Sequence, residues 1–139
     1  MTALLAVAGL AGLSACGGGG SYHNGARPPA PIAISAAIHD DRVQASPTSF
    51  GAGPVTILIS NQSHAAQRVT FETQDVGAAS PGGITESTED IRPLGTATLQ
   101  VDVKDPGTYS LHVRSRAIRP AQLQVGRPRR SSQDDLLLP

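Results

Sequence analysis

The stretch that decides the fold is Thr96-Ala97-Thr98-Leu99-Gln100-Val101-Asp102-Val103. Its odd-numbered residues are apolar and its even-numbered residues are polar, and in a β-strand successive side chains point to opposite faces. Turn formers flank it, with Gly95 before it and Asp105-Pro106-Gly107 after it. We therefore expect a strand over Thr96–Val103 with one buried face.

The same alternation recurs on both sides of this stretch. It predicts strands over Ile32–Ile38, Pro54–Asn61, Gln67–Thr73, Thr108–Arg116 and Ala121–Val125, with a weaker candidate over Ile84–Ile91. No stretch between them has the apolar spacing of a long helix. About seven short strands separated by Gly, Pro and Asp turns are typical of a two-sheet β-sandwich. The fold class is therefore all-β, with a single domain.

The first sixteen residues form an apolar run without charge that ends in Leu13-Ser14-Ala15-Cys16. The run is too short to cross a membrane comfortably, because a membrane helix needs roughly 20 apolar residues. It resembles a bacterial lipoprotein signal peptide. The resemblance implies cleavage before Cys16, the only cysteine of the chain, and attachment of a diacylglycerol and further acyl chains such as palmitate to that residue.

These observations divide the chain into four parts. Residues 1–15 are the expected signal peptide, and 16–31 are a tether rich in Gly and Pro. Residues 32–126 are the expected folded domain, and 127–139 a disordered tail. The tail carries Leu136, Leu137 and Leu138, which either fold back onto the domain or dock in a groove of a partner protein. The lipid anchor would hold the protein on the extracytoplasmic side of a cell membrane.

Two segments of the expected domain resemble the cupredoxins, the blue-copper type of β-sandwich. Phe50–Asn61 is similar to the glycine-led strand, ending in Asn, that precedes the first copper histidine of that family. Asp105–His112 is similar to the Pro-Gly-Thr-Tyr strand that leads to the copper cysteine. The resemblance implies a Greek-key sandwich that covers roughly Ile32–Val125.

The copper ligands of the family do not carry over to this chain. The position of the first histidine is held by Gln67, and the position of the cysteine by Val113. The second histidine and the methionine are expected in Arg114–Ala121, which contains neither. A blue-copper site needs a thiolate and two imidazoles. We therefore expect a cupredoxin-like domain without type 1 copper, and no cofactor beyond the acyl chains on Cys16.

A second hypothesis is weak metal binding elsewhere. The His39-Asp40-Asp41 run has the side chains that bind a hard or borderline cation, and His64 would approach it if the loops of the sandwich cluster at one end. These residues, His39, Asp40, Asp41 and His64, make the alternative function a metal-handling lipoprotein for copper or another cation. Adjacent Asp residues at a strand end are also typical of a solvated turn.

The chain is neutral, with 11 basic and 11 acidic residues, but its charges are polarised. Six of the basic residues fall between Arg114 and Arg130, and seven of the acidic residues fall between Glu72 and Asp105. His112, Arg114 and Arg116 are spaced by two, which predicts one exposed row on a strand. This row is a candidate interaction surface for anionic headgroups or wall polymers, or a solvated strand face.

No motif in the sequence predicts catalysis, since it has no nucleophile elbow, no phosphate loop and no Cys-His pair. Zero net charge argues against nucleic acid as a partner. The expected function is a non-enzymatic, lipid-anchored binding or interaction module at the cell surface, with a protein of the cell envelope as its partner. A structural subunit of an envelope complex is a further alternative, favoured by the polarised charge and the Leu-rich end.

Overall fold

The computed structural model describes residues 27–75 and 83–131. These residues form nine strands and no helix: β1 (Ile32–Ile38), β2 (Val43–Ser46), β3 (Ser49–Gly51), β4 (Gly53–Asn61), β5 (Val69–Asp75), β6 (Thr85–Ser87), β7 (Thr96–Val103), β8 (Gly107–Val113) and β9 (Ala121–Gly126). Among them there is no helix with the length and apolar character of a membrane span. The predicted signal peptide, Cys16 and Leu136–Leu138 lie outside the described residues.

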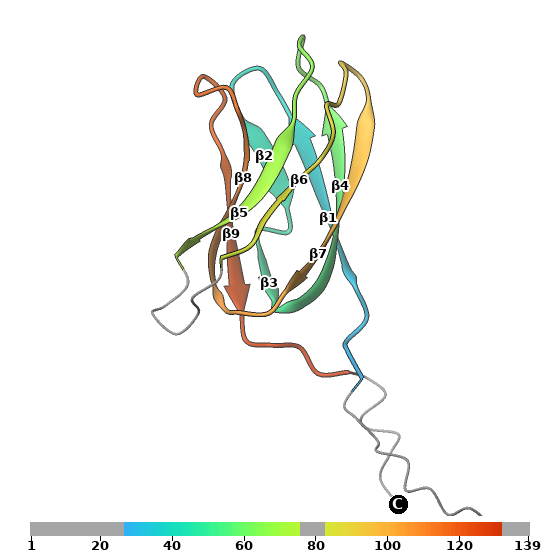
Figure 1. The fold of residues 1–139 in the computed structure, drawn as a ribbon, viewed down its shortest axis with the longest axis vertical. Helices are drawn as coiled ribbons and strands as arrows, with labels where there is room; N and C mark the ends of the chain where they lie inside the picture. The colour runs from blue at the N-terminus through green and yellow to red at the C-terminus, as the bar shows by residue number, and fades with distance from the viewer. Residues whose placement is uncertain (1–26, 76–82, 132–139) are drawn as a thin grey trace, which may run out of the picture.

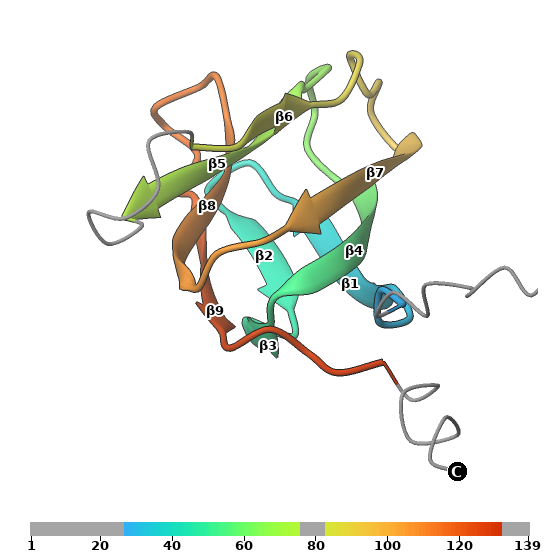
Figure 2. The ribbon, with the colours of Figure 1, turned by 60° about the horizontal axis from the view of Figure 1, so that its bottom comes forward.

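The strands form two sheets that pack face to face (Figures 1 and 2). One sheet has the order β2-β1-β4-β7 and the other the order β3-β9-β8-β5-β6. Pairing is antiparallel except that β1 runs parallel to β4, and β3 parallel to β9. The predicted all-β sandwich is thus confirmed, with two more strands than the alternation indicated.

The core lies between the sheets and is built from the apolar faces that the alternation predicts. In β7, Leu99, Val101 and Val103 are buried while the even-numbered residues between them are exposed. The rings of Phe71 and Tyr109 stack at the centre, with centroids 5.2 Å apart. Burial raises the pKa of the Tyr109 phenol, and its hydroxyl donates a hydrogen bond of 2.8 Å to the carbonyl oxygen of Asp105.

Two predicted strands are too long. The strand predicted to reach Arg116 ends at Val113, because the chain turns there and brings Ile118 back into the core, where it is 6% exposed. The candidate over Ile84–Ile91 is a strand only over Thr85–Ser87. After β6 ends, the chain pairs again at Ile91, whose backbone exchanges two hydrogen bonds with the backbone of Gln67.

The two ends of the sandwich differ in what they carry (Figure 1). Both ends of the described chain, 27–31 and 127–131, leave together at the bottom of the view, and we call this the tether end. The opposite end is formed by the connections 39–42, 62–68, 88–95 and 114–120, and we call it the loop end. Any ligand site built from strand-end loops lies at one of these two ends.

Candidate functional site

Asp40 and His64 meet at the loop end. The strands β1 and β4 run parallel with Ile38 opposite Asn61, so the loops that follow them lie side by side. The backbone N–H of His64 donates to one carboxylate oxygen of Asp40 at 2.9 Å, and its Nδ1 contacts the other oxygen. The N–H of His64, followed by its side chain, lowers the pKa of the Asp40 carboxyl.

The other two residues of the metal hypothesis, His39 and Asp41, make no hydrogen bond or ion pair with this pair in the described chain. Asp41 turns away from His64 and pairs with Arg42 at 3.1 Å and Arg119 at 3.4 Å. The backbone N–H of His39 donates to the carbonyl oxygen of Arg42. In the part of the chain that the structure describes, no three His, Cys, Asp or Glu side chains come together in a way that could hold a metal ion.

Two residues, Gln67 and Val113, are the ones that the sequence resemblance assigns to blue-copper ligand positions. Gln67 is half-buried, and its backbone pairs with Ile91 through hydrogen bonds of 3.0 and 2.8 Å. Val113 is 5% exposed and lies opposite Val69 in the β5–β8 pair. The resemblance would require an imidazole at Gln67 and a thiolate at Val113, and these residues supply an amide and an isopropyl group. These residues do not fit a blue-copper ion.

The loop end is organised by a buried residue that the alternation does not single out as functional. Asn61 is fully buried. Its amide nitrogen donates to the carbonyl oxygens of Ile91 at 2.7 Å and Ala65 at 2.8 Å, and its amide oxygen accepts from the backbone N–H and the hydroxyl of Ser63. These bonds tie two connections of the loop end, 62–68 and 88–95, to the end of β4. The sequence signals it by its place at the end of a strand, directly before a loop, and by its match to the Asn that ends the corresponding strand in the resemblance.

The predicted row of basic side chains is only partly formed. His112 lies on β8 and contacts Glu72 on β5, with 3.1 Å between Nε2 and the carboxylate. Arg114 and Arg116 are exposed, but they lie in the connection after β8 and not on the strand. The expectation of one row along a strand is therefore wrong, because the strand ends at Val113. The two arginines belong to the loop end.

The tether end is closed by Arg129. Its guanidinium donates to three backbone carbonyl oxygens: Gly51 at 3.1 Å, Ala30 at 2.6 Å and Pro54 at 2.7 Å. Two glycines leave room for this side chain, since a Cβ at Gly51 or Gly53 would lie 2.7 or 2.8 Å from an Arg129 atom. The segment before β1 and the segment after β9 are thereby fastened to one another.

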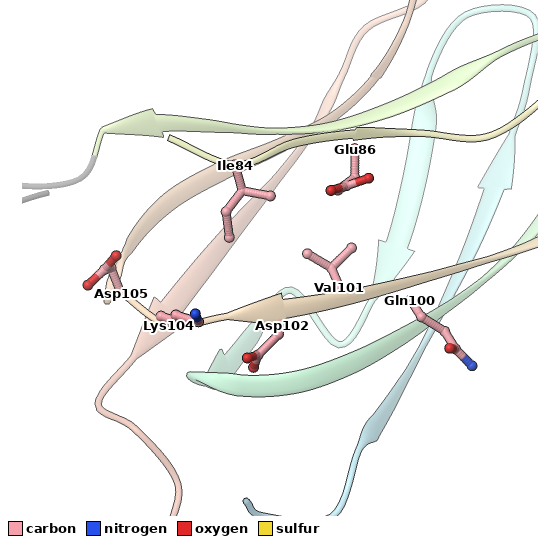
Figure 3. A pocket seen from close by; sticks show the side chains of 7 residues that line it. All are labelled: Ile84, Glu86, Gln100, Val101, Asp102, Lys104 and Asp105. Atoms are coloured by element: carbon pink, nitrogen blue, oxygen red, sulfur yellow. The ribbon is translucent and has the colours of Figure 1, made fainter. Parts of the chain in front are cut away.

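A cleft opens between the free edges of β6 and β7 (Figure 3). It is lined by Ile84, Glu86, Gln100, Val101, Asp102, Lys104 and Asp105. Ile84 and Glu86 point toward β7, and Val101 points back toward them. The lining side chains carry three carboxylates and one amine, and none of them is a histidine, serine or cysteine. The cleft thus does not pair a nucleophile with a base.

No family model matches the chain, and no curated protein matches it. Solved structures do match. Auracyanin B superposes with a TM-score of 0.52 and 15% identity, over 72% of this chain and 91% of auracyanin B. Auracyanin A, described as a "blue" copper protein from the green thermophilic photosynthetic bacterium Chloroflexus aurantiacus, superposes with a TM-score of 0.51 and 16% identity, over 70% and 100%. Identities this low show the fold, so the predicted resemblance is confirmed at that level: the chain folds as a cupredoxin-like β-sandwich.

Proposed function

We propose that this protein is a non-enzymatic, lipid-anchored binding module on the extracytoplasmic side of a membrane, and that its cupredoxin-like domain works without type 1 copper. The proposal is supported by the observed cupredoxin-like fold, together with Gln67 and Val113 at the positions that the sequence resemblance assigns to copper ligands. Val113 is part of the hydrophobic core, so the position that the resemblance assigns to the copper cysteine serves packing. Without copper, the domain acts by binding other molecules at its surface.

The anchor is supported by the sequence and by the way the domain joins its tether. Leu13-Ser14-Ala15-Cys16 has the pattern of a lipoprotein signal, and each buried methylene of an acyl chain adds about 0.8 kcal/mol of membrane affinity, so two or three chains hold a protein stably. The domain receives its tether at one end, where Arg129 holds the carbonyl of Ala30. The four connections of the loop end are then directed away from the anchor.

Intact mass spectrometry of the full chain, expressed in a bacterial host and purified from membranes, tests the anchor. We expect a chain that begins at Cys16 and carries a diacylglycerol, with Cys16→Ser as the matched control that keeps the uncleaved, unlipidated mass. Copper is then added to the lipidated protein, and the visible spectrum is recorded. An unlipidated wild-type N-terminus would overturn the anchor, and an intense visible band with one bound copper would overturn the copper-free domain.

One observation favours the metal-handling alternative, namely the contact between Asp40 and His64. Calorimetry with copper, zinc and calcium separates it from the proposal. Submicromolar binding that is lost in His64→Ala and in His39→Ala would favour the alternative, whereas the binding module predicts no such binding. A structural role in an envelope complex differs from both in requiring Leu136–Leu138, so deleting these residues would release the protein from that complex.

A further inference from the structure

We propose that the loop end is a protein-binding surface whose anchor is the side chain of Leu94, and that the partner offers an apolar pocket with carboxylates at its rim. The inference deepens the proposed function by naming the surface and the chemistry of the partner. It uses the lipid anchor only to decide between a protein and a membrane as the partner.

Leu94 occupies a backbone position that does not suit leucine. Arg92-Pro93-Leu94-Gly95 forms a tight turn, closed by a hydrogen bond of 2.9 Å from the N–H of Gly95 to the carbonyl of Arg92. Pro93 at the second position and a φ of 61° at Leu94 are the features of a type II turn. The third position of that turn normally takes Gly or Asn, because a Cβ is strained at positive φ. No other residue with a side chain in the described ranges has a positive φ.

The side chain of Leu94 contributes little to the core. It is 88% exposed, the largest exposure of any large hydrophobic side chain among the described residues. A single exposed leucine is ordinary on a protein surface. Leu94 differs because its backbone is strained by the positive φ, and a side chain that is 88% exposed gains little burial to offset that strain. Strained residues of this kind cluster at functional sites.

Backbone hydrogen bonds to Asn61 hold this turn in place. The N–H of Leu94 donates to the carbonyl of Asn61 at 2.7 Å, and the N–H of Asn61 donates to the carbonyl of Gly95 at 2.9 Å. Asn61 is itself fixed by the buried hydrogen bonds of its side chain. Leu94 is therefore presented on a rigid support, and a preorganised anchor loses less conformational freedom on binding.

The charges of the loop end indicate the charge of the partner groups that would face them. Its four connections hold six arginines and four acidic residues. Three of the arginines are paired, Arg42 and Arg119 with Asp41, and Arg68 with Glu89 and Asp90. The other three, Arg92, Arg114 and Arg116, make no ion pair within the described residues. Arg92 lies two residues from Leu94, whereas Arg114 and Arg116 lie on the connection at the other side of the loop end (Figure 1). Complementarity then favours a partner with carboxylates beside its pocket and across the rest of the interface.

The position of the tether separates the two kinds of anionic partner. Lipid headgroups carry negative charge, but the tether joins the domain at the opposite end, where Arg129 binds Ala30. With the anchor in the membrane, the described part of the tether leaves the domain on the side away from the loop end. This geometry favours a protein over the membrane surface.

The test begins with the full chain in the membranes of its source cells. A photo-crosslinking amino acid replaces Leu94, and the same group at Thr98, exposed on β7, is the control. The protein crosslinked through position 94 is identified and purified, and its affinity for wild type, Leu94→Asn and Arg92→Glu is measured. We expect Kd to rise at least tenfold in each variant, and binding to weaken with added salt because exposed charges are screened.

Thermal unfolding distinguishes this surface role from a structural one. Since asparagine tolerates positive φ, we expect Leu94→Asn to unfold at a temperature equal to or above that of wild type. A lower unfolding temperature, equal affinity of wild type and variant, or crosslinking no stronger at position 94 than at 98 would overturn the proposal.

Vesicles containing phosphatidylglycerol test the membrane as partner. Binding of wild type to them that is lost in Leu94→Asn would overturn the choice of a protein. The Cys16→Ser variant keeps the two proposals apart. If the wild-type chain carries no lipid but the unlipidated domain still binds the partner through Leu94, the anchor fails and the Leu94 surface stands.

Discussion

Each end of the sandwich contains a residue with positive φ and an arginine, but the two ends differ in how these residues are accommodated. At the tether end, positive φ falls on Gly53, and Arg129 satisfies three backbone carbonyls. At the loop end, positive φ falls on Leu94, and Arg92 makes no ion pair within the described chain. One end places its positive φ on a glycine and satisfies the guanidinium of Arg129 within the domain. The other leaves a strained leucine and an arginine without an ion pair facing solvent, which is what an interaction surface requires.

Asn61→Ala tests whether the loop end is rigid. Of the substitutions considered, it is expected to change the free energy of unfolding most. The substitution removes the amide's hydrogen bonds to the carbonyls of Ile91 and Ala65 and leaves the buried N–H of Ser63 without its acceptor. Because a buried polar group without a partner costs ~1–3 kcal/mol, we expect a loss of about 3 kcal/mol or more in the free energy of unfolding, measured with urea. Gln62→Ala, at an exposed neighbour, is the control. A small loss at Asn61 would mean that the support under Leu94 is loose.

Arg129→Ala tests the closure of the tether end. Three hydrogen bonds from a charged donor to carbonyl oxygens are removed, and such bonds contribute about 1.5–3 kcal/mol each when intact and buried. Arg129 is only partly buried, so we expect a total loss of about 1–2 kcal/mol in urea unfolding, together with faster proteolysis after Ala30. Arg130→Ala changes an exposed neighbour with the same charge. Equal stability of the two variants would remove the contrast between the ends.

Asp40→Asn gives the smallest expected effect and sharpens the description of the loop end. The folded-state pKa of Asp40 is lowered by His64, so its charged form adds stability above the unfolded pKa of about 3.9. That contribution is lost as pH falls through the lower folded-state pKa. We expect the stability difference between wild type and variant to be present at pH 6 and to vanish in strong acid, in urea titrations at each pH. A difference that stays constant with pH would show that the Asp40 contact does not depend on its charge.

Much of the fold could be predicted from periodicity alone. Thr96–Val103 and Ile32–Ile38 are strands with the predicted bounds, because each alternates and is bounded by turn formers or charged residues. β2 and β3 are too short, at 4 and 3 residues, for alternation to be recognised. The parallel pairing of β1 with β4 depends on contacts between distant residues, which no local pattern contains.

The candidate site was less predictable than the fold. The approach of His64 to Asp40 followed from clustering of the loops, but the turn of Asp41 toward Arg119 depends on a residue 78 positions away. Leu94 gives no signal in the sequence, because Arg-Pro-Leu-Gly places glycine one residue after the position that positive φ would favour. Its strain is visible only once the backbone is known.

The parallel pairing of β1 with β4 also has a mechanical consequence. Every residue of β1 is in register with β4, from Ile32 opposite Val55 to Ile38 opposite Asn61. The tether enters β1 at one end of the sandwich, and a partner held at Leu94 lies at the other. Tension between membrane and partner would therefore act along the strands and load the β1–β4 hydrogen bonds together in shear, after Arg129 has released Ala30. The domain is arranged to bear a pull along its axis without opening one bond at a time.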